Sequence, residues 1–235
     1  MLERKLSSLI ELKHLCKEYQ LGDQVIEAVA NIDLTIDAGE LISICGPSGA
    51  GKSTLMDIIG LLETPTSGQY FFNGEDISNF DDVKRSKLRN QFIGFAFQSF
   101  FLLNNLSAWQ NVALPLTYQQ LRPHEIKERS IAMLEKVGLG QRTHHKPTEL
   151  SGGQQQRVAI ARALVTHPKI ILADEPTGSL DSEVGQTIMA FLKKLNREDK
   201  VTIIIVTHDP EVAAQCDRQI HIRNGKLLTD EVTVK

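Results

Sequence analysis

This 235-residue chain carries, near its start, the stretch Gly46-Pro47-Ser48-Gly49-Ala50-Gly51-Lys52-Ser53. The stretch matches the pattern G-x-x-x-x-G-K-[ST], which forms a phosphate-binding loop when a strand precedes it and a helix follows. Both neighbours are expected here, because an apolar run, 41–45, comes before it and a helical pattern, 53–62, comes after it. Glycines let backbone N–H groups turn inward around phosphate oxygens, and the helix N-terminus favours the anion. The stretch therefore predicts a nucleotide-phosphate site at the end of a buried strand.

Chemical roles follow for several side chains. Lys52 is expected to reach the β- and γ-phosphates of ATP, and the Ser53 hydroxyl to ligate Mg²⁺. A second apolar run, 170–173, is followed directly by Asp174 and Glu175. Asp174 can hold Mg²⁺, usually through water, and Glu175 is the natural general base for an attacking water. Two acids after a strand could equally be a surface feature, but beside a P-loop they indicate ATP hydrolysis.

The spacing of apolar residues predicts an α/β core. Three short, almost wholly apolar runs suit strands that are buried on both faces: 41–45, 170–173 and 201–206. A helical stripe lies between the last two, over 182–200, with Ser182 as its expected N-cap. Strands that alternate with helices in this way are typical of α/β folds.

Two further regions depart from that alternation. Segments 9–19 and 25–36, with hairpin signals at Asn73-Gly74 and Asn224-Gly225, predict an antiparallel subdomain. Residues from about 85 to 165 are mostly helical or loop-like in pattern, and Gly138 is expected to end a helix there. They predict a helical lobe inserted into the core.

Composition limits the possible functions. The net charge is −3 and 23% of residues are charged, so the chain as a whole lacks the basic character of a nucleic-acid-binding protein. Three widely spaced cysteines give no zinc or disulfide pattern, which fits a reducing compartment. The first eight residues have no cleavable signal pattern, and no apolar run approaches membrane-helix length. Any membrane role is therefore expected to come through a partner.

The stretch Leu150-Ser151-Gly152-Gly153-Gln154, continued by 155–164, identifies the family. It resembles the signature of the ABC ATPases, and Asp174 lies 20 residues beyond Gln154, as in that family. Ser151 and Gln154 also form a capping-box pattern that opens a helix, which gives the chain a second phosphate-binding end. The resemblance implies an α/β P-loop NTPase core of ABC ATPase type, with an antiparallel β subdomain and an inserted helical lobe. The expected single domain spans 9–229, with the core at 9–84 and 166–229 and the lobe at 85–165.

The resemblance also implies how the parts work together. In ABC ATPases the signature of one subunit closes over the ATP on the P-loop of the other, so a head-to-tail homodimer, or a pair with a closely related ATPase, encloses two ATPs. Further matches assign Gln98 to the Q-loop, which senses Mg²⁺ and the attacking water, and His208 to the switch histidine at the γ-phosphate. Asp181 belongs to the D-loop at the dimer interface. Tyr19 fits the aromatic residue that stacks on adenine, although a strand-end tyrosine often only packs. The residues implied to bind ATP are Tyr19, Gly46, Pro47, Ser48, Gly49, Ala50, Gly51, Lys52, Ser53, Thr54, Ser151, Gly152, Gly153, Gln154 and Asp181; those implied in catalysis are Lys52, Gln98, Glu175 and His208, and those near the metal are Ser53, Gln98 and Asp174.

Three longer features are similar to the group of MacB-type macrolide exporters and LolD-type lipoprotein-releasing ATPases: 95–103 followed by 111–116, then 174–182, and then 207–213. That group implies an integral membrane permease with a large extracytoplasmic domain, and an ATPase that is peripheral to the cytoplasmic side of the inner membrane. Ser179 departs from the more usual Asn, which is not expected to alter the chemistry. Segment 100–106 is expected either to dock the permease or simply to pack in the core. Two alternatives remain: a non-transport ABC ATPase that regulates a cell-envelope or cell-division partner, and, far less favoured, an ATPase acting on ribosomes or DNA.

Overall fold

The computed structural model describes residues 8–232, and the chain divides into two compact units. The first unit holds the described residues up to Ser86 and from Asn196 onward, and the second holds Lys87–Leu195. No helix among the described residues is both long enough and apolar enough to cross a membrane.

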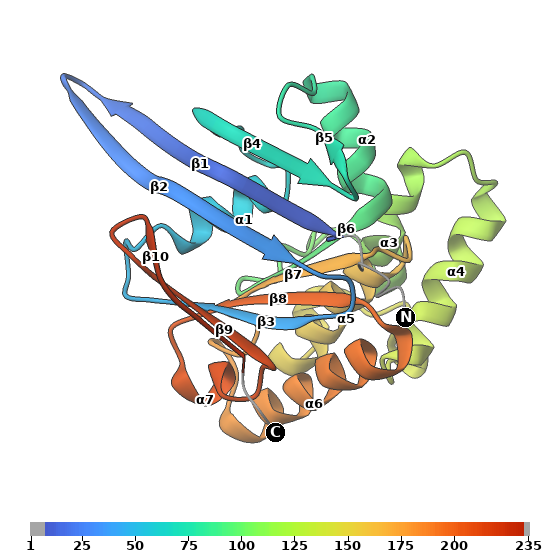
Figure 1. Cartoon of the computed structure of the whole chain (residues 1–235). Coiled ribbons are helices and arrows are strands. Elements are labelled where there is room, and N and C mark those ends of the chain that lie inside the picture. Colours follow the sequence, from blue (N-terminus) through green and yellow to red (C-terminus); the bar gives the residue numbers. More distant parts are fainter. Residues whose placement is uncertain (1–7, 233–235) are drawn as a thin grey trace, which may run out of the picture. The chain divides into compact units, whose positions relative to one another are not determined.

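An antiparallel sheet in the first unit contains two long strands that run side by side (Figure 1). Its strand order is β2-β1-β4-β5, with bounds β1 Ile10–Leu21, β2 Gln24–Ile36, β4 Ser67–Phe72 and β5 Glu75–Asp76. Near the end of β2, Ile32, Leu34 and Ile36 are buried while the residues between them are exposed, as expected of a strand with one core face. Asn73 and Gly74 both have positive φ, so the predicted hairpin turn between β4 and β5 is confirmed.

A second group of strands in this unit contains two of the predicted buried strands, β3 (Leu41–Cys45) and β8 (Thr202–Thr207), which pair in parallel. The order is β10-β9-β3-β8, and the bounds of the other two strands are β9 Arg218–Arg223 and β10 Lys226–Val232. Every residue of β3 and β8 is buried, which explains why both read as unbroken apolar runs. Asn224 and Gly225 again take positive φ in the β9–β10 turn. The short helices of this unit are α1 Lys52–Ile59 and α7 Pro210–Ala213.

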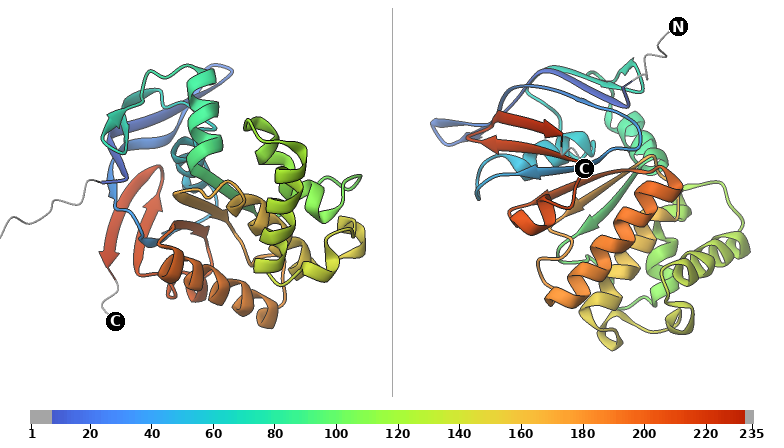
Figure 2. Two further views of the ribbon diagram at one scale, coloured as in Figure 1. Left: turned by 90° about the vertical axis from the view of Figure 1, so that its right-hand side faces the viewer. Right: turned by 60° about the horizontal axis from the view of Figure 1, so that its bottom comes forward.

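The second unit combines two parallel strands with a set of helices. Strand β6, Ile93–Phe97, pairs with β7, Ile170–Asp174, and Phe97 lies opposite Asp174. Helices α3, α4 and α5 pack on one another, and both views in Figure 2 draw them together in green to yellow. Their bounds, with the 3₁₀ turns between them, are α3 Ala108–Ala113, η1 Leu114–Tyr118, α4 Pro123–Lys136, η2 Gly140–Arg142, η3 Pro147–Glu149 and α5 Gly152–Leu164.

Helices α2, Asp82–Phe92, and α6, Ser182–Asp199, complete the described elements, and α6 corrects one expectation. The N-cap prediction at Ser182 is wrong, because Ser182 is already helical. The Asp181 carboxylate accepts from the Val184 N–H at 2.9 Å instead. An aspartate outcompetes the following serine here because its charged oxygen also interacts favourably with the helix dipole.

Strand β6 is a further difference, because the segment around it was expected to be helical or loop-like. Gly94 explains how the strand fits: a Cβ there would lie 2.2 Å from the Ala163 carbonyl oxygen of α5, so the strand and helix approach through this glycine. The structure confirms the end of α4 before Gly138, which has φ +75°. The predicted domain boundaries stay a prediction.

Candidate nucleotide-binding and hydrolysis site

The P-loop joins β3 to α1 through backbone conformations that need glycine. Gly46 and Gly51 have φ of +154° and +100°, and a Cβ on them would lie 2.1 Å from the Ile222 carbonyl oxygen and 2.2 Å from that of Ala28, respectively. Both contacts are far inside van der Waals distance, so no other residue fits without backbone movement. The loop is therefore shaped by close backbone approach as well as by positive φ.

Lys52 is the first residue of α1, and its side chain turns back into the loop. Its ammonium donates to the carbonyl oxygens of Gly46 and Pro47 at 2.8 and 2.9 Å. The charge therefore lies among the loop's own backbone groups, at the N-terminus of a helix. A phosphate at this place would meet both a cation and the positive end of the helix dipole.

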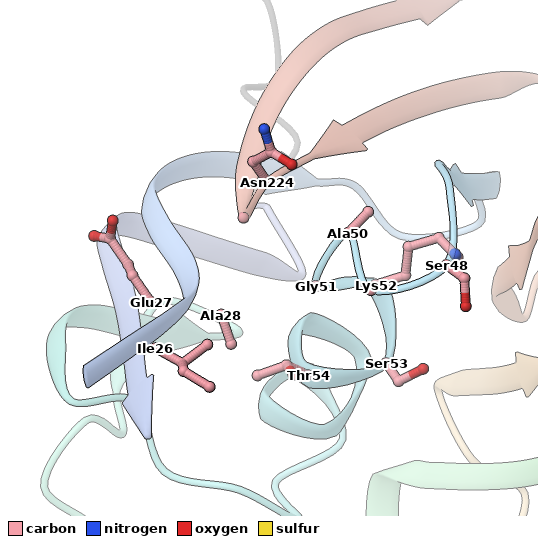
Figure 3. A pocket seen from close by; sticks show the side chains of 12 residues that line it. Ile26, Glu27, Ala28, Ser48, Ala50, Gly51, Lys52, Ser53, Thr54 and Asn224 are labelled. Atoms are coloured by element: carbon pink, nitrogen blue, oxygen red, sulfur yellow. The ribbon is translucent and has the colours of Figure 1, made fainter. Parts of the chain in front are cut away.

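A cavity of about 470 Å³ opens beside this loop, a volume within the range of ligand pockets. Figure 3 shows its walls: the P-loop and the start of α1, residues 26–28 of β2, and Asn224 from the β9–β10 turn. Gly225 donates its N–H to the Ala50 carbonyl at 2.9 Å and accepts from the Ala30 N–H at 2.8 Å, so backbone hydrogen bonds hold this turn to the loop.

Sequence reasoning placed only part of this lining. Residues 48–54 were predicted, whereas Gly46 and Pro47 lie in the loop but not on the cavity wall. The wall residues that were missed are Ile26, Glu27, Ala28, Asn224 and Gly225. The Asn-Gly hairpin signal was recognised, but nothing in its local sequence indicated that the turn would contact the P-loop.

Tyr19 lies beside the cavity rather than on its wall. In the β1–β2 ladder it is directly opposite Ile26, which lines the cavity, so the two side chains share a face of the sheet. Tyr19 as a residue is 38% exposed, and its hydroxyl donates to Glu63 at 3.5 Å. A ring in this position is accessible for stacking on a ligand.

His208 follows β8 directly, next to the strand that leads into the P-loop. The parallel register pairs Cys45 of β3 with Thr207 of β8, so the residues that follow them leave the same edge of the sheet. Asp209 accepts from the Glu211 N–H at 2.8 Å and caps α7. This cap fixes the backbone direction immediately after His208. The structure thus brings the predicted switch histidine and the P-loop to neighbouring strand ends within one unit.

A second group of predicted residues meets in the other unit. Because Phe97 and Asp174 are register partners, Gln98 and Glu175 emerge from adjacent strand ends. Gly178 lies close to both side chains, since a Cβ there would be 3.1 Å from Gln98 Nε2 and 3.5 Å from Glu175 Cβ. Glu175 itself has φ +43°, an unfavourable conformation for a non-glycine residue, of a kind found at functional sites.

The signature segment starts α5 as predicted. Ser151 Oγ accepts from the Gln154 N–H at 3.4 Å, and the Gln154 side chain accepts from the Ser151 N–H at 3.0 Å, which completes the capping box. A Cβ on Gly153 would lie 2.4 Å from Val184 Cγ1, and one on Gly152 would lie 3.3 Å from Leu180 Cδ2. The signature glycines therefore pack directly against the D-loop and the start of α6.

The Q-loop is fastened from two sides. Ser179, which stands where Asn is more usual, still reaches it by donating to the Gln98 carbonyl at 3.3 Å. On the other side, the Arg162 guanidinium of α5 donates to the Phe100 and Phe101 carbonyls, both at 2.6 Å. Burial lowers the pKa of Arg162 from its very high ordinary value.

The residues predicted near a metal offer hard oxygen ligands: the Ser53 hydroxyl, the Gln98 amide and the Asp174 carboxylate. This donor chemistry fits Mg²⁺, which prefers oxygen and is usually held by few protein groups together with water and phosphate oxygens. Among the described residues no group of three or more His, Cys, Asp or Glu side chains is arranged for a metal ion. Water and nucleotide oxygens would complete the coordination of an ion held by Ser53 or Asp174.

Comparison with known proteins identifies the class. The family model for the ABC transporter domain matches residues 29–178. The chain is 50% identical over 223 residues to the ABC transporter ATP-binding protein YvrO of Bacillus subtilis, covering 95% of this chain and 97% of that protein. It is 47% identical over 225 residues to the macrolide export ATP-binding/permease protein MacB 1 of Yersinia pestis, covering 96% of this chain but only 34% of that protein.

The fold agrees with a solved dimer of an ATP-binding cassette in a post-hydrolysis state with ADP and Pi. The TM-score is 0.88 at 44% identity, covering 95% of this chain and 98% of that one. The chain thus has the α/β fold of an ABC ATPase, as the signature predicted. It belongs to the ABC transporter family, and it is an ATP-binding and ATP-hydrolysing component of that family.

Proposed function

We propose that the chain powers a MacB-like transporter as a homodimer, or as a pair with a closely related ATPase, enclosing two ATPs. It works at the cytoplasmic side of the cell membrane with an integral permease that has a large extracytoplasmic domain. The substrate is a lipoprotein, a peptide or a hydrophobic compound, moved outward or extracted from the membrane. The 47% identity to a protein named as both ATP-binding protein and permease carries this proposal. The name of that protein joins an ATPase to a permease, and this chain matches 34% of its length.

In this mechanism each group has one task. The P-loop and Lys52 bind the phosphates, and Tyr19 stacks on adenine. Glu175 takes the proton of the attacking water, while Gln98 and His208 orient that water and the γ-phosphate. Ser53 and Asp174 are the residues that would hold Mg²⁺, and the bound ion would neutralise the charge of the phosphates. The signature and Asp181 complete the site of the facing subunit, so that binding closes the dimer and hydrolysis reopens it.

Segment 100–106 is the proposed contact with the permease. Phe101 and Leu103 are 63% and 47% exposed, which argues against the alternative that the segment simply packs in the core. Phe101 is held in place, since its ring makes an edge contact with Phe97 at 5.2 Å between centroids. Two exposed apolar side chains on a fastened loop suit a partner surface more than free solvent.

The dimer is tested with Glu175→Gln, which removes the base but keeps the size of the side chain. With MgATP this variant is expected to elute from a sizing column as a stable dimer, because hydrolysis no longer separates the subunits. Adding Lys52→Ala to the same chain should return it to a monomer, since ATP no longer binds. A Glu175→Gln chain that stays monomeric at saturating MgATP would contradict the ATP-sandwich proposal.

The transport role is tested by co-purification of the tagged chain from membranes in mild detergent. Recovery of a stoichiometric permease with a large outer domain is the expected result. A membrane partner bound to envelope hydrolases, without transport of any compound, would instead favour the regulatory alternative. Recovery of the chain alone, dimerising with ATP, would contradict both.

A further inference from the structure

A lysine lies against the ring of Tyr19. The Lys17 Nζ is 4.9 Å from the ring centroid, within the distance of a cation–π contact. Only 13% of the Lys17 side chain is exposed, which is unusual for a lysine. Lys17 therefore occupies a fixed place beside the ring instead of extending into solvent.

Glu63 holds both members of this pair. Its Oε1 accepts from Lys17 Nζ at 2.9 Å, and its Oε2 accepts from the Tyr19 hydroxyl at 3.5 Å. The Lys17 ammonium also donates to the Thr64 carbonyl at 2.8 Å. One carboxylate thus contacts the cation above the ring and the polar end of the ring itself.

Glu63 is in turn anchored to the helix that carries the P-loop lysine. Its N–H donates to the Asp57 carbonyl of α1 at 3.1 Å. The following residues are fastened to β1, since the Thr66 N–H donates to the Cys16 carbonyl at 2.8 Å and Thr66 Oγ1 accepts from the Glu18 N–H at 2.9 Å. The segment that ends α1 is therefore tied to the strand that carries Tyr19.

We infer that Lys17 and Glu63 are positioning residues for the base of the nucleotide: the ammonium covers one face of the Tyr19 ring, Glu63 fixes its tilt, and the other face receives adenine. The inference rests on the proposed stacking role of Tyr19. Fixing the ring before the base arrives removes the entropy cost of ordering it on binding. Because the same segment continues from α1, the base position is set relative to the phosphate site.

The test compares two ligands that share phosphates but differ in the base: MgATP and magnesium tripolyphosphate, titrated calorimetrically into the intact chain. Lys17→Met is expected to weaken ATP binding by about 3- to 10-fold, the size of a partly buried cation–π contact. Tripolyphosphate binding should stay within about twofold, since its affinity comes from the P-loop. Lys17→Arg should restore most of the ATP affinity, because arginine also stacks on aromatic rings.

Lys13→Met is the matched control on the same strand. Lys13 lies 4.7 Å from the Phe71 ring centroid and pairs with Glu11 at 3.2 Å. Unlike Tyr19, which is opposite Ile26, neither Phe71 nor Glu11 is opposite a cavity-lining residue in the sheet. Lys13→Met should therefore change the affinity for neither ligand. Glu63→Gln is a second test variant, which removes only the charge of the side chain. It is expected to show the same selective loss of ATP affinity.

Four outcomes overturn the inference. Equal weakening of both ligands would mean that Lys17 only supports the fold, and unchanged or tighter ATP binding would mean that it does not position the ring. If Tyr19→Ala also leaves the ratio of the two affinities unchanged, the stacking role of Tyr19 itself fails. A loss of ATP selectivity in Tyr19→Ala but not in Lys17→Met would overturn the positioning role alone.

Discussion

The glycines of the P-loop differ in how closely other atoms surround them. Replacing them with alanine should therefore reduce stability by different amounts. A Cβ at Gly51 meets the Ala28 carbonyl oxygen at 2.2 Å, whereas a Cβ at Gly49, φ +74°, has nothing within 4 Å. Gly49→Ala is therefore expected to cost only the strain of left-handed backbone, about 1–2 kcal/mol. Gly51→Ala should cost clearly more and lower ATP affinity, because the loop must move away from β2. Urea unfolding and ATP titration of the two variants check this, and equal costs would contradict it.

At the residue scale, prediction worked where chemistry needs a fixed local spacing. The loop between β3 and α1 and the capping pair Ser151 and Gln154 lie where the sequence placed them, because each depends on neighbours within a few positions. Ser182 failed as a cap for a similar local reason, since the adjacent Asp181 is the stronger acceptor. Glu27 and Asn224 were missed because their place at the cavity depends on contacts between segments far apart in the chain.

Strand β4 is joined to the end of α1 by one buried hydrogen bond. The Tyr70 side chain is 2% exposed, and its hydroxyl donates to the Ile59 carbonyl at 2.8 Å. Burial raises the pKa of Tyr70 above its ordinary value of 10. Because the pKa of Tyr70 is higher in the folded chain than in the unfolded chain, its contribution to the free energy of unfolding is complete below pH 10. It is lost as pH rises above 10, because only the unfolded chain then ionises.

The prediction compares the wild type with Tyr70→Phe. At pH 8 the variant should be less stable by about 1–2 kcal/mol, since the Ile59 carbonyl loses its donor. Between pH 8 and pH 11 the wild type should lose about 1.4 kcal/mol that the variant keeps, so the gap should shrink. Urea unfolding at pH 8 and pH 11 measures both, and a gap that is unchanged at pH 11 would contradict the assigned cause.

The Q-loop depends on α5 through Arg162. Phe100 and Phe101 both have positive φ, 58° and 45°, and both carbonyls accept from this guanidinium. Arg162→Met should therefore destabilise the chain by about 2–4 kcal/mol, because two charge-assisted hydrogen bonds are lost. Hydrogen exchange over 99–103 should also become faster. Arg157→Met on the same helix is the control, and equal acceleration there would show that the effect is not specific to Arg162.

Elements were predictable when one periodicity dominated. β3 and β8 were recognised because both of their faces are buried, and the two Asn-Gly turns because left-handed backbone favours those residues. β6 was missed although it pairs with β7. Its sequence, Ile-Gly-Phe-Ala-Phe, is short and contains a glycine, which weakens a strand signal. The glycine is required by the contact with α5, which local sequence does not reveal.

At the scale of the whole molecule, the family was predictable because its signature is long and specific, whereas the substrate was not. The described residues hold the nucleotide machinery, and in relatives such as MacB the remaining two thirds of the protein lie outside the region that matches. Under the proposed function, recognition of a transported compound is a task for the permease. The consequence is that tests on the isolated chain address ATP and assembly rather than transport.

The head-to-tail arrangement makes a prediction about mixtures of two inactive chains. Lys52→Ala disables the P-loop, and Ser151→Arg, at an exposed residue, places bulk and charge on the signature. Each homodimer then has two defective sites. A mixed dimer combines the intact P-loop of one chain with the intact signature of the other, because a twofold interface pairs the segments reciprocally.

Mixing equal amounts should restore up to about a quarter of wild-type ATPase activity, since half the dimers carry one good site. Activity that stays at the level of the separate variants would mean that the signature does not act on the facing subunit's ATP.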